Sequence, residues 1–143
     1  MIEIKIISEK EDIQKNFEIR HHVFHKEMGI HSTSEFDKYD KKNLCTYFLA
    51  IYKNKPCGAA RTRIEENFII VERVCVLKEF RGLGIGKEII KTIVKENNIA
   101  LNFSLFSPIS SIIFFTQFGF KSKAGKKNKN DEPVQYMERK NNI

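Results

Sequence analysis

Three glycines at alternate positions stand between two basic residues in the segment Arg81-Gly82-Leu83-Gly84-Ile85-Gly86-Lys87. A glycine lets the backbone approach oxygen atoms without a Cβ in the way. The segment follows an apolar run typical of a strand and precedes residues 85–97, whose apolar positions have helical spacing. Because the first N–H groups of a helix are unpaired and carry partial positive charge, this arrangement predicts an anion site suited to a pyrophosphate.

Two common nucleotide motifs do not match this glycine turn. The Walker pattern requires Gly-Lys-Ser/Thr, whereas Gly86-Lys87 is followed by Glu88. The dinucleotide fingerprint follows the first strand of a parallel unit, whereas this turn follows an expected antiparallel meander in mid-chain. The glycine spacing alone is equally typical of a tight turn without a ligand.

One carboxylate precedes the turn in an unusually apolar strand. Glu72 lies two residues before Val74, and strand alternation predicts that both side chains share a face. A carboxylate there could take the proton from an amine, which has a reference pKa near ~10 and needs a base at neutral pH. The alternative is that Glu72 only pairs with Arg73, Arg61 or Arg63 across the meander.

The cysteines and histidines give no metal or disulfide pattern. Three cysteines without a Cys-x-x-Cys spacing do not form a disulfide framework or a zinc site. Cys75 alternates away from Glu72, which favours a buried apolar cysteine over a covalent acetyl carrier. His21 and His25 would share a helix face, but no Cys or carboxylate pair completes a ligand set, so no metal is expected.

Composition narrows the classes of partner. The net charge of +7 favours anionic partners such as phosphorylated small molecules. The basic stretch 121–129 lacks interleaved aromatic residues, so we expect no nucleic-acid partner. The apolar runs are far short of a membrane span and the N-terminus has no signal pattern, so we expect no membrane partner and a cytoplasmic location.

Periodicity and turn residues predict a mixed α/β domain spanning residues 1–143. A first strand begins at Ile2, and a helix over residues 9–28 would begin with a Ser8–Glu11 capping box. Residues 30–43 are expected to be turn-rich. An antiparallel meander over 44–52, 57–64 and 68–77 follows, and then a helix over 85–97, a strand over 100–106, a helix from Pro108 to about 118, and short strands over 120–122 and 134–139.

The segment from Val74 to Gly86 resembles the acetyl-CoA signature of the GNAT superfamily, Arg/Gln-x-x-Gly-x-Gly/Ala after an apolar strand. Further segments, in the right order, are similar to a bacterial branch called ElaA-like, and together the matches cover about residues 17–139. They are Ile19-Arg20 to Val23-Phe24 with Glu27, the acidic stretch Asp37 to Asp40, Glu72-Arg73-Val74, Phe114 to Phe120, and Asp131 to Met137.

The resemblance implies a GNAT-like, mostly antiparallel central sheet, flanked by helices and splayed between its fourth and fifth strands. It also implies direct transfer of an acetyl group from acetyl-CoA to the primary amine of a small molecule. The pyrophosphate would bind the backbone of residues 81–87, and the pantetheine arm would lie along the preceding strand. The implied cofactor-binding residues are Val74, Cys75, Val76, Arg81, Gly82, Leu83, Gly84, Ile85, Gly86, Lys87 and Phe115.

The chain departs from the family pattern at the expected general acid. Many members have a tyrosine at the position of Phe115, and an asparagine where Pro108 stands. Phe115 has no proton to give. A water molecule or Tyr136 could protonate the departing thiolate instead, so Glu72 and Tyr136 are the candidate catalytic residues.

The acceptor amine is predicted from the charges on the meander. Arg61, Arg63, Glu72 and Asp37 are the candidate substrate-binding residues, and the arginines favour an amine that also carries phosphate. A hexosamine phosphate such as glucosamine 6-phosphate fits that description, and a homodimer is also expected. One alternative is an enzyme that acts on protein lysines or N-termini, because the acidic stretch could attract a basic peptide. The other is a non-catalytic acyl-CoA sensor, which the absence of a tyrosine at position 115 favours.

Overall fold

The computed structural model describes residues 1–97, 101–126 and 133–141. Within these residues seven strands form one sheet in the order β1-β2-β3-β4-β5-β7-β6, mostly antiparallel with a parallel β4–β5 pair. The strands are β1 (Ile2–Ile7), β2 (Thr46–Tyr52), β3 (Lys55–Glu65), β4 (Phe68–Val76), β5 (Asn102–Pro108), β6 (Lys121–Ser122) and β7 (Val134–Arg139). The helices are α1 (Lys10–Arg20), η1 (His21–Glu27), α2 (Ser32–Glu35), α3 (Lys38–Lys41), η2 (Lys78–Phe80), α4 (Ile85–Glu96), η3 (Ile109–Ser111) and α5 (Ile112–Thr116).

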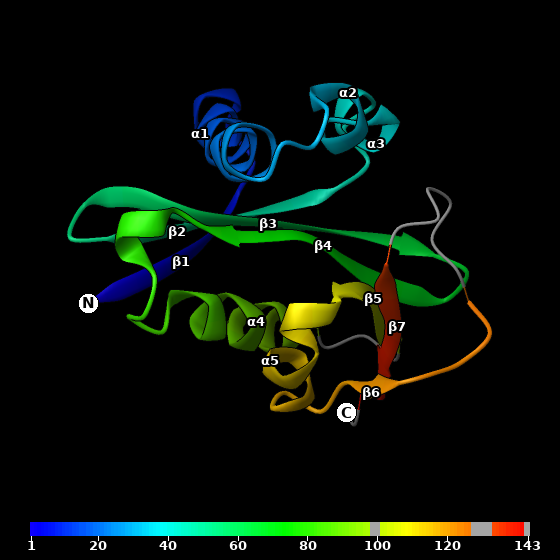
Figure 1. Ribbon diagram of the computed structural model, residues 1–143. Coiled ribbons are helices and arrows are strands. Elements are labelled where there is room, and N and C mark those ends of the chain that lie inside the picture. Colours follow the sequence, from blue (N-terminus) through cyan, green and yellow to red (C-terminus); the bar gives the residue numbers. More distant parts are fainter. Residues whose placement is uncertain (98–100, 127–132, 142–143) are drawn as a thin grey trace.

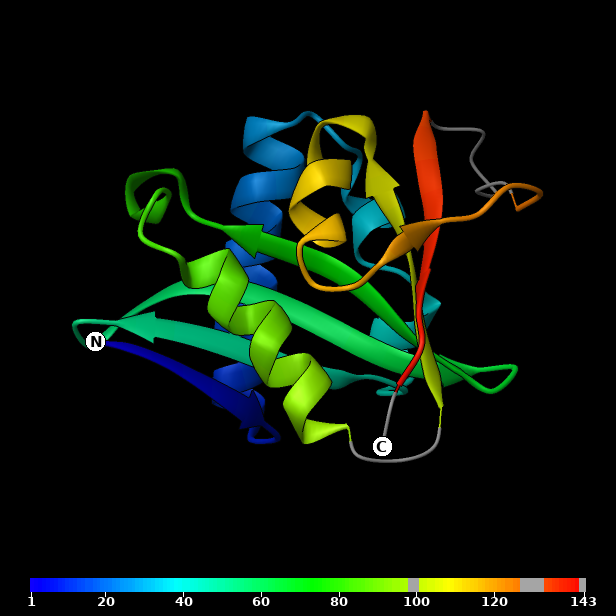
Figure 2. The same ribbon diagram turned by 90° about the horizontal axis from the view of Figure 1, so that it is seen from below.

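Helices cover both faces of the sheet. Figure 1 shows α1, α2 and α3 above it and α4 and α5 below it. Figure 2, seen from below, shows α4 running diagonally across the strands of the meander. This arrangement confirms the expected α/β fold with helices on either side of a largely antiparallel sheet.

The meander β1–β4 forms because its strands alternate between two apolar layers. In β2, Phe48 and Ala50 belong to the layer that packs against α4, whereas Tyr47 and Leu49 belong to the layer that packs against α1. The two-residue turns Lys53-Asn54 and Glu66-Asn67 have positive φ at both positions. That geometry suits the twist of a two-residue hairpin, which explains the tight returns between β2 and β3 and between β3 and β4.

The layer below the sheet is built on the apolar stripe of α4. Ile85, Ile89, Ile90 and Ile93 are buried, as their spacing predicted. They pack with residues of β2, β5, α5 and β7, among them Phe48, Phe103, Leu105, Phe115 and Met137. This layer holds α4, and therefore the glycine turn before it, firmly against the sheet.

The N-terminal helix differs from the expected one in its start and its second half. Glu9, not Ser8, precedes the first turn, and its side chain makes no capping hydrogen bond, so the predicted capping box is wrong. After Arg20 the backbone continues as the π-helical turn η1, which ends near Gly29. A π-helical turn widens the helix and changes the direction of its later side chains.

The segment expected to be turn-rich contains two short helices. Asp37 begins α3 by accepting the backbone N–H of Tyr39, and Asp40 returns the contact by accepting the N–H of Asp37. This is a capping box made of two aspartates three residues apart. The Asp-x-x-Asp spacing in the acidic stretch is the sequence pattern that corresponds to this cap.

The region after β5 also differs from the prediction. Ser107 and Pro108 belong to β5 rather than starting a helix, and the helical backbone begins at Ile109 as η3 and continues as α5. Pro108 is tolerated because β5 has a partner on one side only at this end: it pairs with β7 there but no longer with β4. Residue 100, residues 127–129 of the basic stretch and residues 131–132 of the last motif lie outside the described residues.

Candidate active site

The glycine turn forms the start of α4. Gly82 and Gly84 have φ values of 82° and 86°, a conformation that favours glycine. The first helical bond runs from the N–H of Glu88 to the carbonyl of Gly84, so the N–H groups of residues 85–87 have no partner inside the helix. A Cβ added at Gly82 or Gly84 would meet no atom within 4 Å, so open space lies beside both residues.

A cavity of about 240 Å³ lies beside this turn. Most of the residues predicted to bind the cofactor line it, whereas Val74, Cys75, Leu83 and Phe115 do not. The sequence did not single out Phe114, whose ring lies 3.4 Å from the place of a Cβ on Gly86, or Phe80. The lining residues are Val76, Phe80, Arg81, Gly82, Gly84, Ile85, Gly86, Lys87 and Phe114.

Arg81 already has partners beside the cavity. Its Nη1 and Nη2 donate to Glu27 Oε2 and Oε1 at 2.6 and 3.0 Å, and its Nε donates to the carbonyl of Val76 at 2.9 Å. The hydrogen bond from Arg81 holds the pKa of the Glu27 carboxyl below its ordinary value. The pair joins the end of η1 to the glycine turn, a contact that no local pattern in the sequence predicts.

The sheet opens next to this cavity. β4 and β5 pair only at Phe68–Asn102, Ile69–Phe103 and Ile70–Ser104, and the rest of each strand lies beyond this ladder. This is the predicted splay between the fourth and fifth strands. Val76, on the far part of β4, reaches the cavity wall.

Two residues predicted to contact the cofactor are buried in apolar layers. Phe115 is 7% exposed and packs edge-on against Phe114 and Phe120 in the layer below the sheet. Cys75 belongs to the layer on the α1 side, on the face opposite to Val74 and Val76. Burial raises the pKa of the Cys75 thiol to about 12, which agrees with a neutral packing residue and not with a nucleophile.

Glu72 lies on the α1 face of β4, among arginines. Its Oε1 accepts hydrogen bonds from Arg61 Nε at 3.2 Å and Arg63 Nε at 2.9 Å. All its hydrogen bonds and ion pairs within the described residues use Oε1, and the side chain is 19% exposed. The prediction that Glu72 shares a face with Val74 is wrong, because β4 contains a bulge: Arg73 has a φ of 57°, and Val74 packs on the α4 side.

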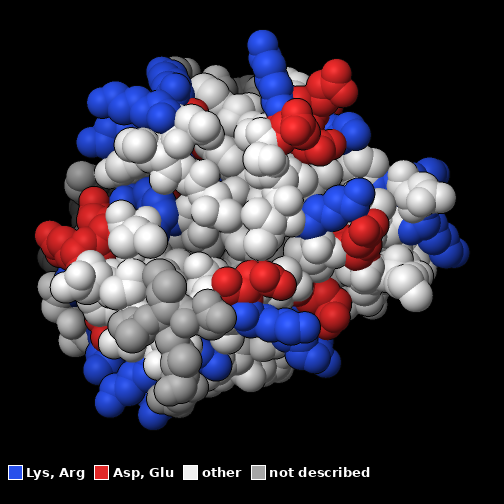
Figure 3. All heavy atoms as spheres, turned by 180° about the vertical axis from the view of Figure 1, so that it is seen from behind, with Lys and Arg blue, Asp and Glu red and all other residues white. Residues whose placement is uncertain are grey.

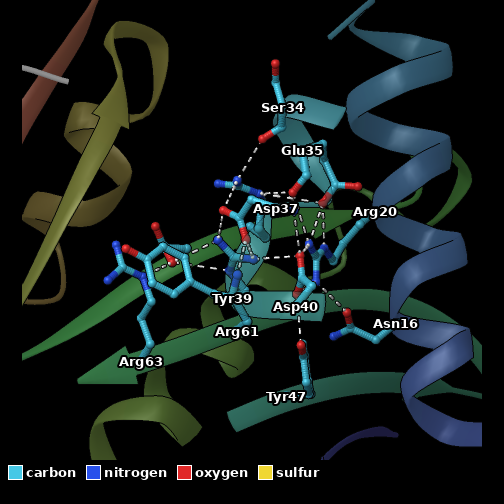
Figure 4. Close-up of polar contacts among 12 residues, drawn as sticks. Asn16, Arg20, Ser34, Glu35, Asp37, Tyr39, Asp40, Tyr47, Arg61 and Arg63 are labelled. Atoms are coloured by element: carbon cyan, nitrogen blue, oxygen red, sulfur yellow. Dashed lines mark hydrogen bonds and ion pairs between the residues drawn. The ribbon is translucent and has the colours of Figure 1, made fainter. Parts of the chain in front are cut away.

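Arg61 is inside the molecule, not at its surface. Its side chain is fully buried and forms ion pairs with Asp37 and Asp40, both at 2.7 Å (Figure 4). It also pairs with Glu72 at 3.1 Å. These carboxylates raise the pKa of the guanidinium despite the opposing effect of burial. Arg61 is therefore not placed where a substrate anion could reach it. It acts neither as a surface charge nor as an anion ligand, because its guanidinium is buried among carboxylates of the chain itself.

Arg63 and Asp37 keep partial access to solvent. The Arg63 guanidinium lies 3.9 Å from the centre of the Tyr39 ring and is 13% exposed. Asp37 is 26% exposed and accepts from Arg61 and from Arg73. The structure thus brings the four predicted acceptor-site residues together, but as one set of mutual ion pairs.

The sequence did not assign a role to the deepest part of this network. Arg20 donates to Glu35, to Asp40 and to the amide oxygen of Asn16 (Figure 4). Burial acts to raise the pKa of the Asp40 carboxyl, but hydrogen bonds and charge from Arg20 and Arg61 hold it below its ordinary value. An arginine on the apolar face of an amphipathic helix was the signal that could have revealed this network.

Tyr136 lies on β7 beside Phe106 of β5, with ring centres 5.2 Å apart. Its hydroxyl donates to Glu138 Oε2 at 2.7 Å. Burial, together with the hydrogen bond and charge of Glu138, raises the pKa of the phenol to about 12. Tyr136 therefore keeps its proton throughout the neutral range.

Neither a metal cluster nor a membrane-spanning helix occurs in the part of the chain that the structure describes. No three His, Cys, Asp or Glu side chains there are grouped to hold a metal ion, and His21 and His25 simply stack at 4.7 Å. None of the described helices is both long and apolar enough to cross a bilayer.

Comparison with known proteins identifies the family. Residues 43–122 match the model of the acetyltransferase (GNAT) domain. A Bacillus subtilis protein named as an acetyltransferase is 36% identical over 123 residues, 83% of each chain, and the B. subtilis protein YyaT is 30% identical over 122 residues, 82% of each chain.

Solved structures share the fold. Escherichia coli ElaA superposes with a TM-score of 0.83 at 18% identity, covering 98% of this chain and 100% of its own. The PaiA N-acetyltransferase of Thermoplasma acidophilum, solved in complex with coenzyme A, has a TM-score of 0.71 at 21% identity, covering 98% and 99%. These structural matches show the fold. The match to the domain model and the identity to the B. subtilis relatives show that the chain belongs to the GNAT family of acetyltransferases.

Proposed function

We propose that the chain transfers an acetyl group directly from acetyl-CoA to the primary amine of a small molecule. The observation that carries this proposal is the parting of β4 from β5 beyond Ile70, beside the unpaired N–H groups at the start of α4. Glu72 stands on the same strand, past the last residue that pairs with β5. An acid–base group and an anion site therefore flank one opening in the sheet.

The residues of the glycine turn fit a pyrophosphate. Open space beside Gly82 and Gly84, free N–H groups at residues 85–87, and the exposed Lys87 form a concave, positively polarised wall. Residues 81–87 would hold the pyrophosphate, and Val74 and Val76 would lie along the pantetheine arm. When bound, acetyl-CoA would supply an activated acetyl thioester, and the coenzyme A in the PaiA structure supports this choice of cofactor.

Glu72 is the proposed base. Arg61 and Arg63 hold Oε1, while Oε2 makes no hydrogen bond among the described residues and can accept a proton from an ammonium group. The same contacts also fit the alternative that Glu72 is only a structural ion-pair partner. The activity of Glu72→Gln as a function of pH separates these roles.

Tyr136, or a water molecule, is proposed to protonate the departing thiolate, because Phe115 carries no proton. The raised pKa of Tyr136 means that the phenol holds its proton at neutral pH. Its hydroxyl points to Glu138 on the same strand, so it would have to exchange this partner to reach a thiolate.

An amino-sugar phosphate such as glucosamine 6-phosphate is the proposed acceptor that the sequence suggested, and its support is reduced. Arg61 is buried and neutralised, and Arg63 is already paired with Glu65 and Glu72. Amines without an anionic group are therefore supported as acceptors as well as amino-sugar phosphates are. A basic peptide gains no support either, because Glu35 and Asp40 are buried in ion pairs.

Charge on the surface also bears on partners. On the face shown in Figure 3, Lys and Arg side chains are interspersed with Asp and Glu among the described residues. That face offers no continuous basic surface to a large polyanion. A homodimer and a cytoplasmic location stay predictions, which light scattering and cell fractionation would test.

Release of free thiol from acetyl-CoA tests the proposal, with a panel of amino-sugar phosphates, unphosphorylated amino sugars, polyamines, amino acids and lysine peptides. We expect release with at least one small primary amine. Binding of coenzyme A by calorimetry without release for any amine would favour the second candidate, an acyl-CoA sensor, which the phenylalanine at position 115 supports.

A further inference from the structure

Strand β4 contains a residue with an unusual backbone conformation. Arg73 has a φ of 57°, in the left-handed region that a non-glycine residue rarely adopts. Ala59 pairs with Cys75 and Arg61 pairs with Glu72, so Arg73 and Val74 together lie opposite Ala60. This is a β-bulge with its strained residue in the middle of a strand of nine residues.

The bulge reverses which residues of β4 face α4. Before it, Ile69 and Val71 pack in the layer on the α4 side, and after it Val74 and Val76 do so. Unbroken alternation would instead place Arg73 and Cys75 in that layer. Burial of an unpaired guanidinium in an apolar layer is very unfavourable. An arginine at position 73 therefore disfavours a regular strand, which would point its side chain into that layer.

On the other face of the sheet Arg73 finds three acceptors. Its Nε donates to the carbonyl of Glu35 at 3.0 Å, and its Nη2 donates to the carbonyl of Ser34 and to Asp37 Oδ2, both at 3.2 Å. All three acceptors belong to α2 or to the residue that begins α3.

We propose that Arg73 is a positioning residue for the cofactor strand: its guanidinium, anchored on the α2–α3 segment, holds the bulge that turns Val74 and Val76 toward the opening between β4 and β5. Arg73 acts through the backbone of β4 and touches neither the glycine turn nor the cavity. The proposal rests on the proposed function only in taking the ligand of that opening to be coenzyme A. It also links the acceptor side of the sheet to the cofactor side through one side chain.

Two substitutions separate the anchor from the backbone strain. Arg73→Gly removes the guanidinium but adopts a positive φ without strain. Arg73→Val also removes it, disfavours a positive φ, and suits the apolar layer that a regular strand would reach. The measurements are the Kd of the full chain for coenzyme A by calorimetry and the thermal unfolding midpoint Tm.

We expect Kd to rise about fivefold in Arg73→Gly and about tenfold or more in Arg73→Val, because a site that is no longer preorganised must be ordered on binding. The Tm of Arg73→Gly should stay close to that of the wild type, since relief of strain offsets the lost hydrogen bonds. A purely structural Arg73 would lower Tm and leave Kd unchanged. Values of Kd within about twofold of the wild type for both variants would overturn the proposal.

Glu66→Gly is the matched control. Glu66 also has a positive φ, of 50°, but lies exposed in the turn between β3 and β4, so its replacement should leave Kd unchanged. If Arg73→Gly and Arg73→Val fail to fold, Arg73→Lys serves instead, since one ammonium cannot reach all three acceptors, and an unchanged Kd would again overturn the proposal. A wild-type chain that binds coenzyme A but acetylates no amine contradicts only the proposed function, whereas one that does not bind it contradicts both.

Discussion

Glu27 and Arg81 form a bidentate ion pair beside the glycine turn, with N···O distances of 2.6 and 3.0 Å. The two residues are 54 positions apart in the chain. Arg81 also donates to the last carbonyl of β4, that of Val76. The Arg81 guanidinium, which is expected to bind a pyrophosphate, is therefore already paired with the Glu27 carboxylate of η1.

Replacing Glu27 by Gln should strengthen cofactor binding. The change removes a negative charge beside the site and leaves Arg81 more available, so the KM for acetyl-CoA should fall about two- to fivefold at low salt, the size of an exposed ion-pair effect. The effect should shrink at higher ionic strength, because exposed charges are screened. A rise in KM would show instead that Glu27 acts by holding Arg81 in position.

Arg81→Ala should have the opposite effect. We expect the KM for acetyl-CoA to rise about fivefold with little change in kcat, because the lost charge contributes to binding and not to the chemical step. Lys91→Ala is the control, since Lys91 is an exposed cation on α4, the helix that follows Arg81, and its one ion pair among the described residues is with Glu88. Equal KM values for Arg81→Ala and the wild type would count against the pyrophosphate site at this turn.

Glu72→Gln tests the proposed base. At neutral pH kcat should fall about a hundredfold, and activity should recover as the pH approaches the amine pKa near ~10, where the substrate no longer needs a base. Glu65→Gln is a matched control, because Glu65 also pairs with Arg63 but is half exposed at the end of β3. Full activity of Glu72→Gln across this pH range would leave Glu72 with a structural role only.

Tyr136→Phe tests the proposed acid. If Tyr136 protonates the thiolate, kcat should fall about tenfold or more while the KM for acetyl-CoA stays the same, because the interaction exists only in the chemical step. No loss at low pH is expected from Tyr136 itself, since its raised pKa of about 12 keeps the phenol protonated. An unchanged kcat would point to water as the proton source.

Asp40→Asn should destabilise the fold. Asp40 is completely buried between Arg20 and Arg61, so removing its charge leaves two buried guanidinium groups short of a partner, at a cost of about 3–5 kcal/mol in the free energy of unfolding. Urea titration measures this loss. Asp12→Asn, which affects an exposed pair with Lys15, should change the free energy by less than about 0.5 kcal/mol.

The same carboxylate makes stability depend on pH. The folded-state pKa of Asp40 lies below its unfolded value, so its contribution is present above the unfolded pKa of about 3.9 and is lost as the pH falls through the lower folded value. The wild type should therefore lose more stability than Asp40→Asn on acidification from about pH 5 to about pH 3. Parallel pH profiles for the two proteins would contradict this assignment.

Local patterns predicted much of the scaffold correctly. The meander and α4 follow from alternation and helical spacing, which act within a few positions of the chain. The helix predicted from Pro108 to about residue 118 is present, but it begins at Ile109, because Ser107 and Pro108 pair with β7 as the end of β5. The prediction of one domain over residues 1–143 stays a prediction.

By itself the sequence determined the glycine turn, the helix behind it and the apolar strand before it, since glycine at 82 and 84 and the isoleucine stripe of α4 express their preferences locally. Only the tertiary structure decided what the charged residues do. Arg61 meets Asp37 24 positions away, Arg73 meets Glu35 38 positions away, and the bulge at Arg73 reverses the alternation that placed Glu72 beside Val74. Charged partners are selected by desolvation and proximity after the chain has folded, and neither is encoded in the spacing of residues along one strand.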